Sequence, residues 1–243
     1  MKKYLLFPVL VVSFGLNLWG ADFSLSAGAG GLLGGFFTRY NATGTTAADK
    51  MTQKVNQFNY GGLLFFDATY AELAVIIQGG AGNYNEVMRK GDAMAPRDGK
   101  GWESTLGFSL LGKYPFTLSE RFKLSPLLGI DYQLALLERR RQTGGIVYDR
   151  TNGIQEQDKD GKKFPLSTWN SFWINVGAGL DYNITKQIYV RGELLYGFRL
   201  MTSYEKDGLE QMKELLNDNN PTLSGLTSGP SLRFAVGYRF WSK

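Results

Sequence analysis

The chain has 243 residues, enough for one sizeable domain, and it contains neither cysteine nor histidine. Disulfides, zinc sites built on His or Cys, and a Ser-His-acid triad are therefore excluded within it. The 27 Lys and Arg exceed the 22 Asp and Glu by a formal charge of +5, which is too diffuse to indicate nucleic-acid binding.

The first 21 residues have the pattern of a secretory signal. Lys2 and Lys3 precede a nearly continuous apolar run over residues 4–18, and the small residues Gly20 and Ala21 follow it. The run is shorter than the roughly 20 residues that a membrane-spanning helix needs. We therefore predict a signal peptide over residues 1–21 and a single domain over residues 22–243.

Eight segments of the remaining chain alternate between apolar and polar side chains with a period of two, as half-buried strands do. Each is as long as, or longer than, the 9–11 residues that a tilted strand needs to cross a bilayer. The segments are residues 22–39, 55–67, 69–80, 102–114, 122–137, 169–182, 187–201 and 231–241.

The connections between these segments alternate in length. Tight connections occur near residue 68 and over residues 115–121 and 183–186, whereas long polar ones cover residues 40–54, 81–101, 138–168 and 202–230. Short turns at one end and long loops at the other are typical of outer-membrane barrels. The fold class that we predict is all-β: an eight-stranded antiparallel up-and-down transmembrane β-barrel with short periplasmic turns and long extracellular loops.

One face of each segment is apolar and free of charge. In the last segment this face carries Leu232, Phe234, Val236, Tyr238 and Phe240. A Lys or Arg facing lipid at mid-depth would cost about 2–4 kcal/mol, so we assign these faces to the lipid. Aromatic residues near the segment ends are expected to form the interfacial girdles: Phe23, Phe37, Phe66, Trp102, Tyr114, Tyr132, Tyr182 and Phe240.

The opposite faces carry glycine, serine and nearly all the charges of the segments. We place these charges inside the barrel, where confined charges must pair: Asp67, Glu72, Glu103, Lys113, Asp131, Asp181, Arg191, Glu193, Arg199, Arg233 and Arg239. For Arg233 and Arg239 we expect Glu193, Asp181 or Glu103 as partners. Two hypotheses stay open for the network: a structural plug, and a gate or proton site.

Two of the long connections carry features of their own. Arg139, Arg140 and Arg141 open the third, either as an anion contact with phosphorylated headgroups or as part of a solvated loop of mixed charge. In the fourth, apolar residues recur at helical spacing over residues 207–217, which predicts a short amphipathic helix outside the barrel. Its apolar stripe would cover the barrel mouth, another loop or a partner, and of these we favour the mouth.

The last segment also carries a family resemblance. Arg233, Ala235, Tyr238 and Phe240 resemble the assembly signal of the small bacterial outer-membrane β-barrels of the OmpA, OmpX and OmpW kind, which has glycine where Ala235 stands. The chain departs from that pattern because Trp241, Ser242 and Lys243 follow Phe240. The resemblance implies contact with outer-membrane lipid, insertion by the outer-membrane assembly machinery and location in the bacterial cell outer membrane.

The function predicted from the sequence is that of a non-enzymatic outer-membrane barrel whose surface loops serve adhesion, host or envelope interaction, or envelope integrity. The alternative is an OmpW-like channel for small hydrophobic molecules. A soluble periplasmic lipocalin-like barrel that binds a ligand is a third hypothesis, because alternation alone does not decide which face is inside. The sequence predicts no catalytic residue, cofactor, metal or nucleic-acid partner, and it leaves the ligand and the oligomeric state undetermined.

Overall fold

A computed structural model describes residues 23–43, 50–90, 93–142, 145–149, 170–200 and 222–242. These residues form one antiparallel sheet with eight long strands and two short ones. The long strands are β1 (Ser24–Thr43), β2 (Lys50–Asp67), β3 (Ala71–Lys90), β4 (Ala93–Lys113), β6 (Phe122–Gln142), β8 (Ser171–Asn183), β9 (Ile188–Arg199) and β10 (Thr222–Ser242). The short strands β5 (Phe116–Thr117) and β7 (Gly145–Asp149) both pair with β6.

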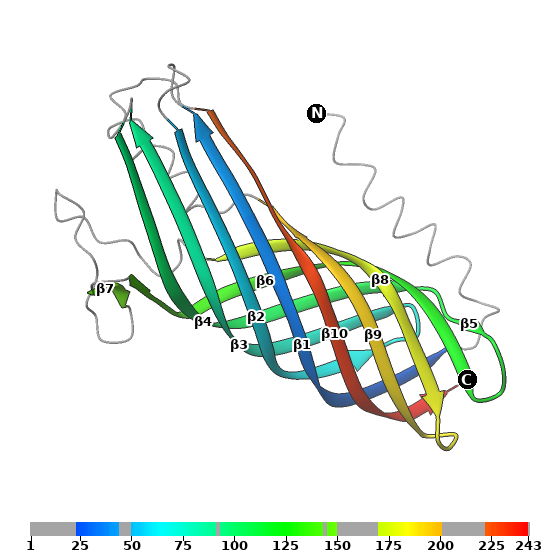
Figure 1. Ribbon diagram of the computed structural model, residues 1–243. Helices are drawn as coiled ribbons and strands as arrows, with labels where there is room; N and C mark the ends of the chain where they lie inside the picture. Colours follow the sequence, from blue (N-terminus) through cyan, green and yellow to red (C-terminus); the bar gives the residue numbers. More distant parts are fainter. Residues whose placement is uncertain are drawn as a thin grey trace, which may run out of the picture.

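The eight long strands close into a ring (Figure 1). Their order is β4-β3-β2-β1-β10-β9-β8-β6, and pairing of β4 with β6 completes the circle. The first and last strands lie side by side, with Gly30 opposite Ala235. Closure pairs the backbone of both edge strands, which a chain in lipid requires. The predicted eight-stranded barrel, and the pairing of its last strand with its first, are confirmed.

The prediction of long loops over residues 40–54 and 81–101 is wrong. Most of residues 40–54 and 81–101 is strand, with Tyr40 opposite Gln53 and Tyr84 opposite Gly99. Figure 1 shows β1 to β4 and β10 running past β8 and β9 at this end of the barrel. The period of two disappears from the sequence here because both faces of a strand above the membrane are polar, while the backbone ladder continues.

The other two predicted loops are also partly strand. β6 continues to Gln142, and β10 begins at Thr222 and contains Pro230. The ladder between β1 and β10 has no pairs between Gly34↔Ser231 and Phe37↔Ser228, beside this proline, which has no N–H to donate. The predicted helix at residues 207–217 and the predicted signal peptide lie outside the described residues.

Tight connections at the opposite end confirm the predicted short turns. They lie at residues 68–70, 114–121 and 184–187, next to the C-terminal end of β10. Thr69 has a φ of 56°, which is uncommon for a residue other than glycine. Its hydroxyl accepts a hydrogen bond from Ser24 N (2.7 Å) and donates one to Ser24 O (3.0 Å), which fixes this turn to the start of β1.

The outer surface of the barrel is an apolar belt. Leu64, Leu194 and Phe234 point outward with 65%, 60% and 52% of their surface exposed. From Ala27 to Phe37 along β1 the belt is roughly 26 Å tall, given the rise per residue and a tilt near 40°. A transmembrane barrel has a belt about 25 Å tall. Among the described residues no helix is long and apolar enough to cross a membrane.

Aromatic pairs mark both borders of the belt. At the short-turn end, Phe66 packs against Phe240 and Phe122 against Tyr182, with ring centroids 6.2 Å and 4.9 Å apart. Toward the long-strand end, Tyr60 packs edge-on against Trp102 at 6.1 Å. Such girdles belong at the two interfaces of a bilayer. The lipid-facing assignment made from the sequence therefore agrees with the exposed faces of the strands.

Candidate functional site

The lower lumen, nearer the short turns, is filled by an ion-pair network centred on Arg191. Its guanidinium donates to Asp181 through Nε (2.6 Å to Oδ1) and Nη2 (2.7 Å to Oδ2). Nη2 also donates to Asp67 Oδ2 at 2.6 Å, and Nη1 donates to Glu72. Lys113 pairs with Asp67 as well. Every member except Asp181 is buried, so the network excludes solvent from this level of the barrel.

The network crosses the whole barrel. Arg191 lies on β9 and Glu72 on β3, and these strands are diametrically opposite in the ring of eight. Asp67 and Glu72 are directly opposite each other on β2 and β3, an arrangement of like charges that is unfavourable without a cation. The Arg191 guanidinium contacts both carboxylates. It also lies over the rings of Phe65 (5.3 Å) and Tyr189 (5.1 Å), which hold it in the centre.

A second bridge crosses the lumen one level higher. Arg233 on β10 donates to Asp131 Oδ2 on β6 (3.0 Å) and to Ser109 Oγ on β4 (3.2 Å). Strands β10 and β4 are also diametrically opposite in the ring. All three residues are buried. Between the two bridges, Leu111, Leu127 and Leu195 form a buried apolar cluster.

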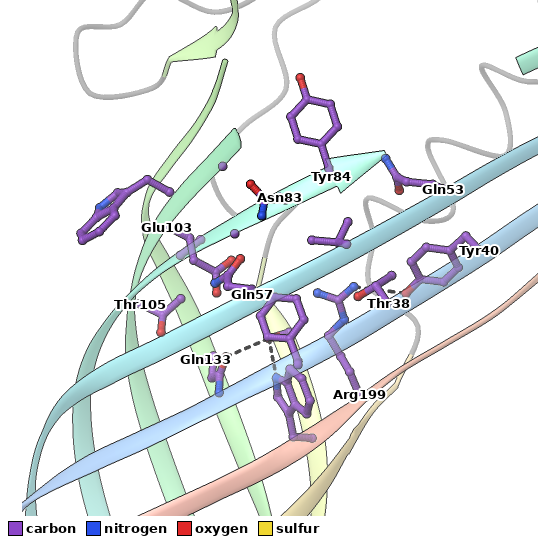
Figure 2. A pocket seen from close by; sticks show the side chains of 18 residues that line it. Thr38, Tyr40, Gln53, Gln57, Asn83, Tyr84, Glu103, Thr105, Gln133 and Arg199 are labelled. Carbon is purple, nitrogen blue, oxygen red and sulfur yellow. Dashed lines mark hydrogen bonds between the residues drawn. The ribbon is translucent and has the colours of Figure 1, made fainter. Parts of the chain in front are cut away.

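The upper lumen, toward the long-strand end, contains two small cavities. Figure 2 shows the upper one, where Arg199 reaches toward Thr38 and Tyr40 and where Glu103, Thr105 and Gln133 come from other strands. Arg199 Nη2 donates to Tyr40 OH on β1 and to Thr227 Oγ1 on β10, both at 3.1 Å. Amides, hydroxyls and aromatic rings dominate the lining here, in contrast to the ion pairs below.

The lower of the two cavities extends down to the Arg233–Asp131 bridge, and the two cavities meet at Phe36, Gln133 and Trp173. They have room for about 50 Å³ and about 60 Å³, which corresponds to about four water molecules each. Ligand pockets are usually 300–1,000 Å³. Thr105 Oγ1, Asn175 Nδ2 and Asp131 Oδ1 are buried in the cavity linings without a partner among the described residues. The dimensions and the polar lining suit water rather than a solute.

The structure brings together several of the charges predicted from the sequence. Asp181, Arg191 and Glu193 meet in the lower network, where Glu193 Oε1 lies 3.9 Å from Arg191 Nε. Asp131 and Arg233 form the second bridge. Glu103 and Arg199 line the upper cavity.

The partners predicted for Arg233 and Arg239 are wrong. Arg233 pairs with Asp131, although Glu193 is its neighbour in register, because the long side chain extends across the lumen instead of along the wall. Arg239 lies at the short-turn end and donates to the backbone oxygen of Lys186 (2.9 Å) and to Asn183 Oδ1 (3.4 Å). It has no carboxylate partner in the described part of the chain.

The residues of the predicted assembly signal and the three arginines of the predicted third loop all lie on strands. Ala235 and Arg233 face inward on β10, while Tyr238 and Phe240 face the outer surface. Arg139, Arg140 and Arg141 are part of strand β6, opposite Trp102, Gly101 and Lys100 of β4. The start of the predicted third loop is therefore strand.

Sequence analysis missed the uncharged residues that hold the arginines. Tyr189 supports Arg191 and accepts or donates a hydrogen bond of 2.8 Å with Ser26, while Ser109 binds Arg233 and Trp173 lines the upper cavity. Their inward position follows from the strand period, but Tyr189 stands where an interfacial aromatic is also plausible. The one available signal was its place two residues before Arg191 on the same face.

No metal centre is visible among the described residues. They include no group of three or more acidic side chains placed to hold a metal ion. The interior carboxylates of the lower lumen instead contact Arg191 or Lys113.

No protein-family model matches the chain. No curated protein matches it at the level of sequence. Solved structures with a similar strand arrangement include Neisserial surface protein A (15% identity, covering 88% of this chain and 99% of that one, TM-score 0.31). A second is the outer membrane protease OmpT from Escherichia coli (12% identity, covering 89% of this chain and 97% of that one, TM-score 0.42). A third is the translocator domain of the autotransporter NalP from Neisseria meningitidis (14% identity, covering 96% of this chain and 94% of that one, TM-score 0.32). Because these identities and TM-scores are low, the assignment of the barrel to a membrane rests on the chain's own geometry.

That geometry identifies the kind of membrane. A closed antiparallel barrel with an even number of strands, short turns at one end, an apolar belt and aromatic girdles is the architecture of bacterial outer-membrane proteins. A soluble lipocalin-like barrel would instead carry its apolar residues inside, around a ligand cavity. The chain is an integral outer-membrane β-barrel.

Proposed function

We propose that this protein is a non-conducting, non-enzymatic outer-membrane barrel that acts from its extracellular end, in surface or envelope interaction. The observation that carries the proposal is the pair of arginine bridges, each joining diametrically opposite strands through the centre of the lumen. They favour the structural plug over the gate. The long-strand end, where the upper strands project past β8 and β9, then offers the surface for a partner (Figure 1).

The energetics of the lower network oppose ion passage. An ion would have to separate Arg191 from at least one of its three paired carboxylates while all the groups stay away from water. Breaking one buried ion pair costs about 3–5 kcal/mol. The leucine cluster between the bridges adds an apolar constriction that would also have to be wetted. Both barriers lie in series along the same axis.

Conductance in planar lipid bilayers tests the proposal. Purified wild-type protein should give no discrete current steps, whereas an Arg191→Ser/Arg233→Ser variant, which removes both bridges, should give them. A Thr105→Cys variant, which keeps both bridges, should likewise give no steps, and steps that a bulky maleimide on this cysteine of the upper cavity abolishes would contradict the proposal. The chain has no native cysteine, so this label is specific.

The orientation has its own test. Lys100 is exposed at the long-strand end and Lys186 in a short turn. A membrane-impermeant maleimide added to intact cells should label Lys100→Cys and leave Lys186→Cys unlabelled. The reverse pattern would place the short turns outside the cell and would contradict the proposal.

A second candidate function is that of a channel from which small hydrophobic molecules leave sideways, through the barrel wall into the lipid. One observation favours it: the inner cavity above the Arg233 bridge and an apolar groove on the outer surface share Gly34, Gly35, Pro230 and Ser231. This is where the β1–β10 ladder lacks pairs. The wall between cavity and lipid is reduced there to backbone and small side chains.

A disulfide across this part of the wall separates the two functions. Gly34 and Ser231 are in register, so Gly34→Cys/Ser231→Cys should oxidise and lock the seam. Ala29→Cys/Val236→Cys is a matched lock lower on the same seam. If only the upper lock lowers uptake of a hydrophobic dye into cells, the lateral channel is supported. Equal uptake in both would refute it.

A further inference from the structure

Two basic side chains stand directly opposite each other on the outer surface near the long-strand end. Arg39 of β1 is in register with Lys54 of β2, and both are exposed. Both belong to the outward-facing series of their strands, because Thr38 and Gln53 beside them are buried. Opposite residues on one face of a sheet have Cβ atoms about 5 Å apart, so two like charges repel here.

Nothing in the described part of the chain offsets this repulsion. Neither side chain forms an ion pair or hydrogen bond there. The remaining neighbours in register are Leu226, beside Arg39, and Asn85, beside Lys54. The carboxylate of Asp98 lies one strand further on and accepts a hydrogen bond from Asn85. An anion from outside the protein would therefore be the first to neutralise the pair.

The position of Arg39 and Lys54 along the barrel axis places them at the membrane interface. Phe37, two residues below Arg39 on the same face, is 58% exposed and belongs to the apolar belt. Two residues along a tilted strand correspond to about 5 Å of height. Arg39 and Lys54 therefore lie just above the hydrocarbon, at the level of lipid headgroups, where a positive charge at an anionic surface is favourable.

The surroundings of the pair are amphipathic. Arg39 and Lys54 line a shallow groove across β10, β1 and β2 together with the apolar Phe37 and Leu226 and the polar Asn56 and Ser224. Leu226 is 54% exposed. Amide and hydroxyl groups beside the cations can bind phosphate oxygens or sugar hydroxyls. The apolar Phe37 below the pair and Leu226 beside Arg39 fit an acyl chain, which free phosphate does not have.

We propose that Arg39 and Lys54 form a binding site for the phosphate group of a phosphorylated lipid headgroup in the outer leaflet. Arg39 offers paired N–H donors that match phosphate oxygens, and Lys54 adds a point charge from the neighbouring strand. The site lies on the outer wall and is separate from the lumen. It rests on the proposed orientation with the long-strand end outside, which cysteine labelling tests independently.

Binding of a defined lipid to purified full-length protein tests the site. The probe is bisphosphorylated lipid A, titrated onto the detergent-solubilised barrel and followed by native mass spectrometry, with its dephosphorylated form as a reference. Because each basic residue at an anionic surface contributes about fivefold, Arg39→Gln/Lys54→Gln should weaken binding about 30-fold. Lys186→Gln removes the same kind of charge at the other end and should leave binding unchanged.

Lys54→Glu separates binding from folding. It replaces the like-charge pair with an opposite-charge pair, so the barrel should keep its heat-modifiable migration on a gel while phosphate-dependent binding is lost. Unchanged binding in Arg39→Gln/Lys54→Gln, or an equal loss in Lys186→Gln, would overturn the proposal. Displacement of the lipid by an equimolar amount of inorganic phosphate would also overturn it, since the site would then recognise soluble phosphate.

Discussion

Replacement of Arg191 by methionine should destabilise the barrel more than any other single change to its interior charges. Methionine fills a similar volume but removes the ion-pair partner that Asp67, Glu72, Asp181 and Glu193 share. Lys113 then keeps its ion pair with Asp67. Four hydrogen bonds to carboxylates disappear together with the contacts to Phe65 and Tyr189. The barrel loses a group that joins β9 to both β2 and β3.

The magnitude follows from burial. Arg191 is 6% exposed and Glu72 2%, so water cannot replace the lost partner without opening the lumen. Removing one member of a buried ion pair typically costs about 3–5 kcal/mol. With an m-value of about 2 kcal/mol/M in urea, the unfolding midpoint should fall by about 2 M.

Urea unfolding in lipid vesicles, read by heat-modifiable migration on a gel, measures this change. Arg239→Met is the matched control, because Arg239 has no carboxylate partner among the described residues and should cost about 1 kcal/mol. Neutralising the stranded acids in Arg191→Met/Glu72→Gln/Asp181→Asn should recover part of the loss. The reasoning is refuted if Arg191→Met shifts the midpoint no further than Arg239→Met, or if the triple variant is less stable than the single one.

Two further pairs of variants test the wall and its environment by the same unfolding assay. Gly30→Ala should lower the free energy of unfolding by about 1–3 kcal/mol, because its Cβ would lie 2.0 Å from Phe234 O across the closing seam. Gly192→Ala, whose Cβ would have no atom within 4 Å, should leave it unchanged. Equal effects of the two changes would contradict the packing of the seam. Leu64→Arg in the belt should cost about 2–4 kcal/mol, whereas Ile184→Arg in a short turn should cost little, although both residues are exposed (65% and 56%). Equal tolerance of the two arginines would indicate that water, not lipid, surrounds the belt.

The fold could be predicted from the sequence because lipid enforces the strand period. A charge on the outer face within the belt is costly, so the alternation in residues such as 232–240 directly reports inside and outside. Above the belt that constraint ends. Strand continues there through Tyr40 and Tyr84, whose neighbours are polar on both faces, and the sequence has no remaining signal to separate strand from loop.

The candidate site could be predicted only in part. The strand period places Arg191, Arg233, Asp131 and Asp181 in the lumen, but it does not give the vertical stagger between strands that are distant in the ring. Partners across the lumen depend on that stagger. Arg233 illustrates this: its neighbour in register is Glu193, and its ion-pair partner is Asp131, 102 residues away in sequence.

Paired and unpaired charges lie at different heights along the barrel axis, so we expect the charges that stabilise the fold to differ from those that bind other molecules. In the lower half, cations and carboxylates face each other across the lumen, and buried pairs of this kind are strongly destabilising to break. In the upper half amides, hydroxyls and aromatic rings dominate the lining, and on the outer wall at the same end Arg39 and Lys54 have no partner among the described residues. Groups already paired inside the fold have little affinity left for a ligand. We therefore expect contacts with lipid or another molecule to add most to the free energy of binding at Arg39, at Lys54 and at the projecting strands of the long-strand end.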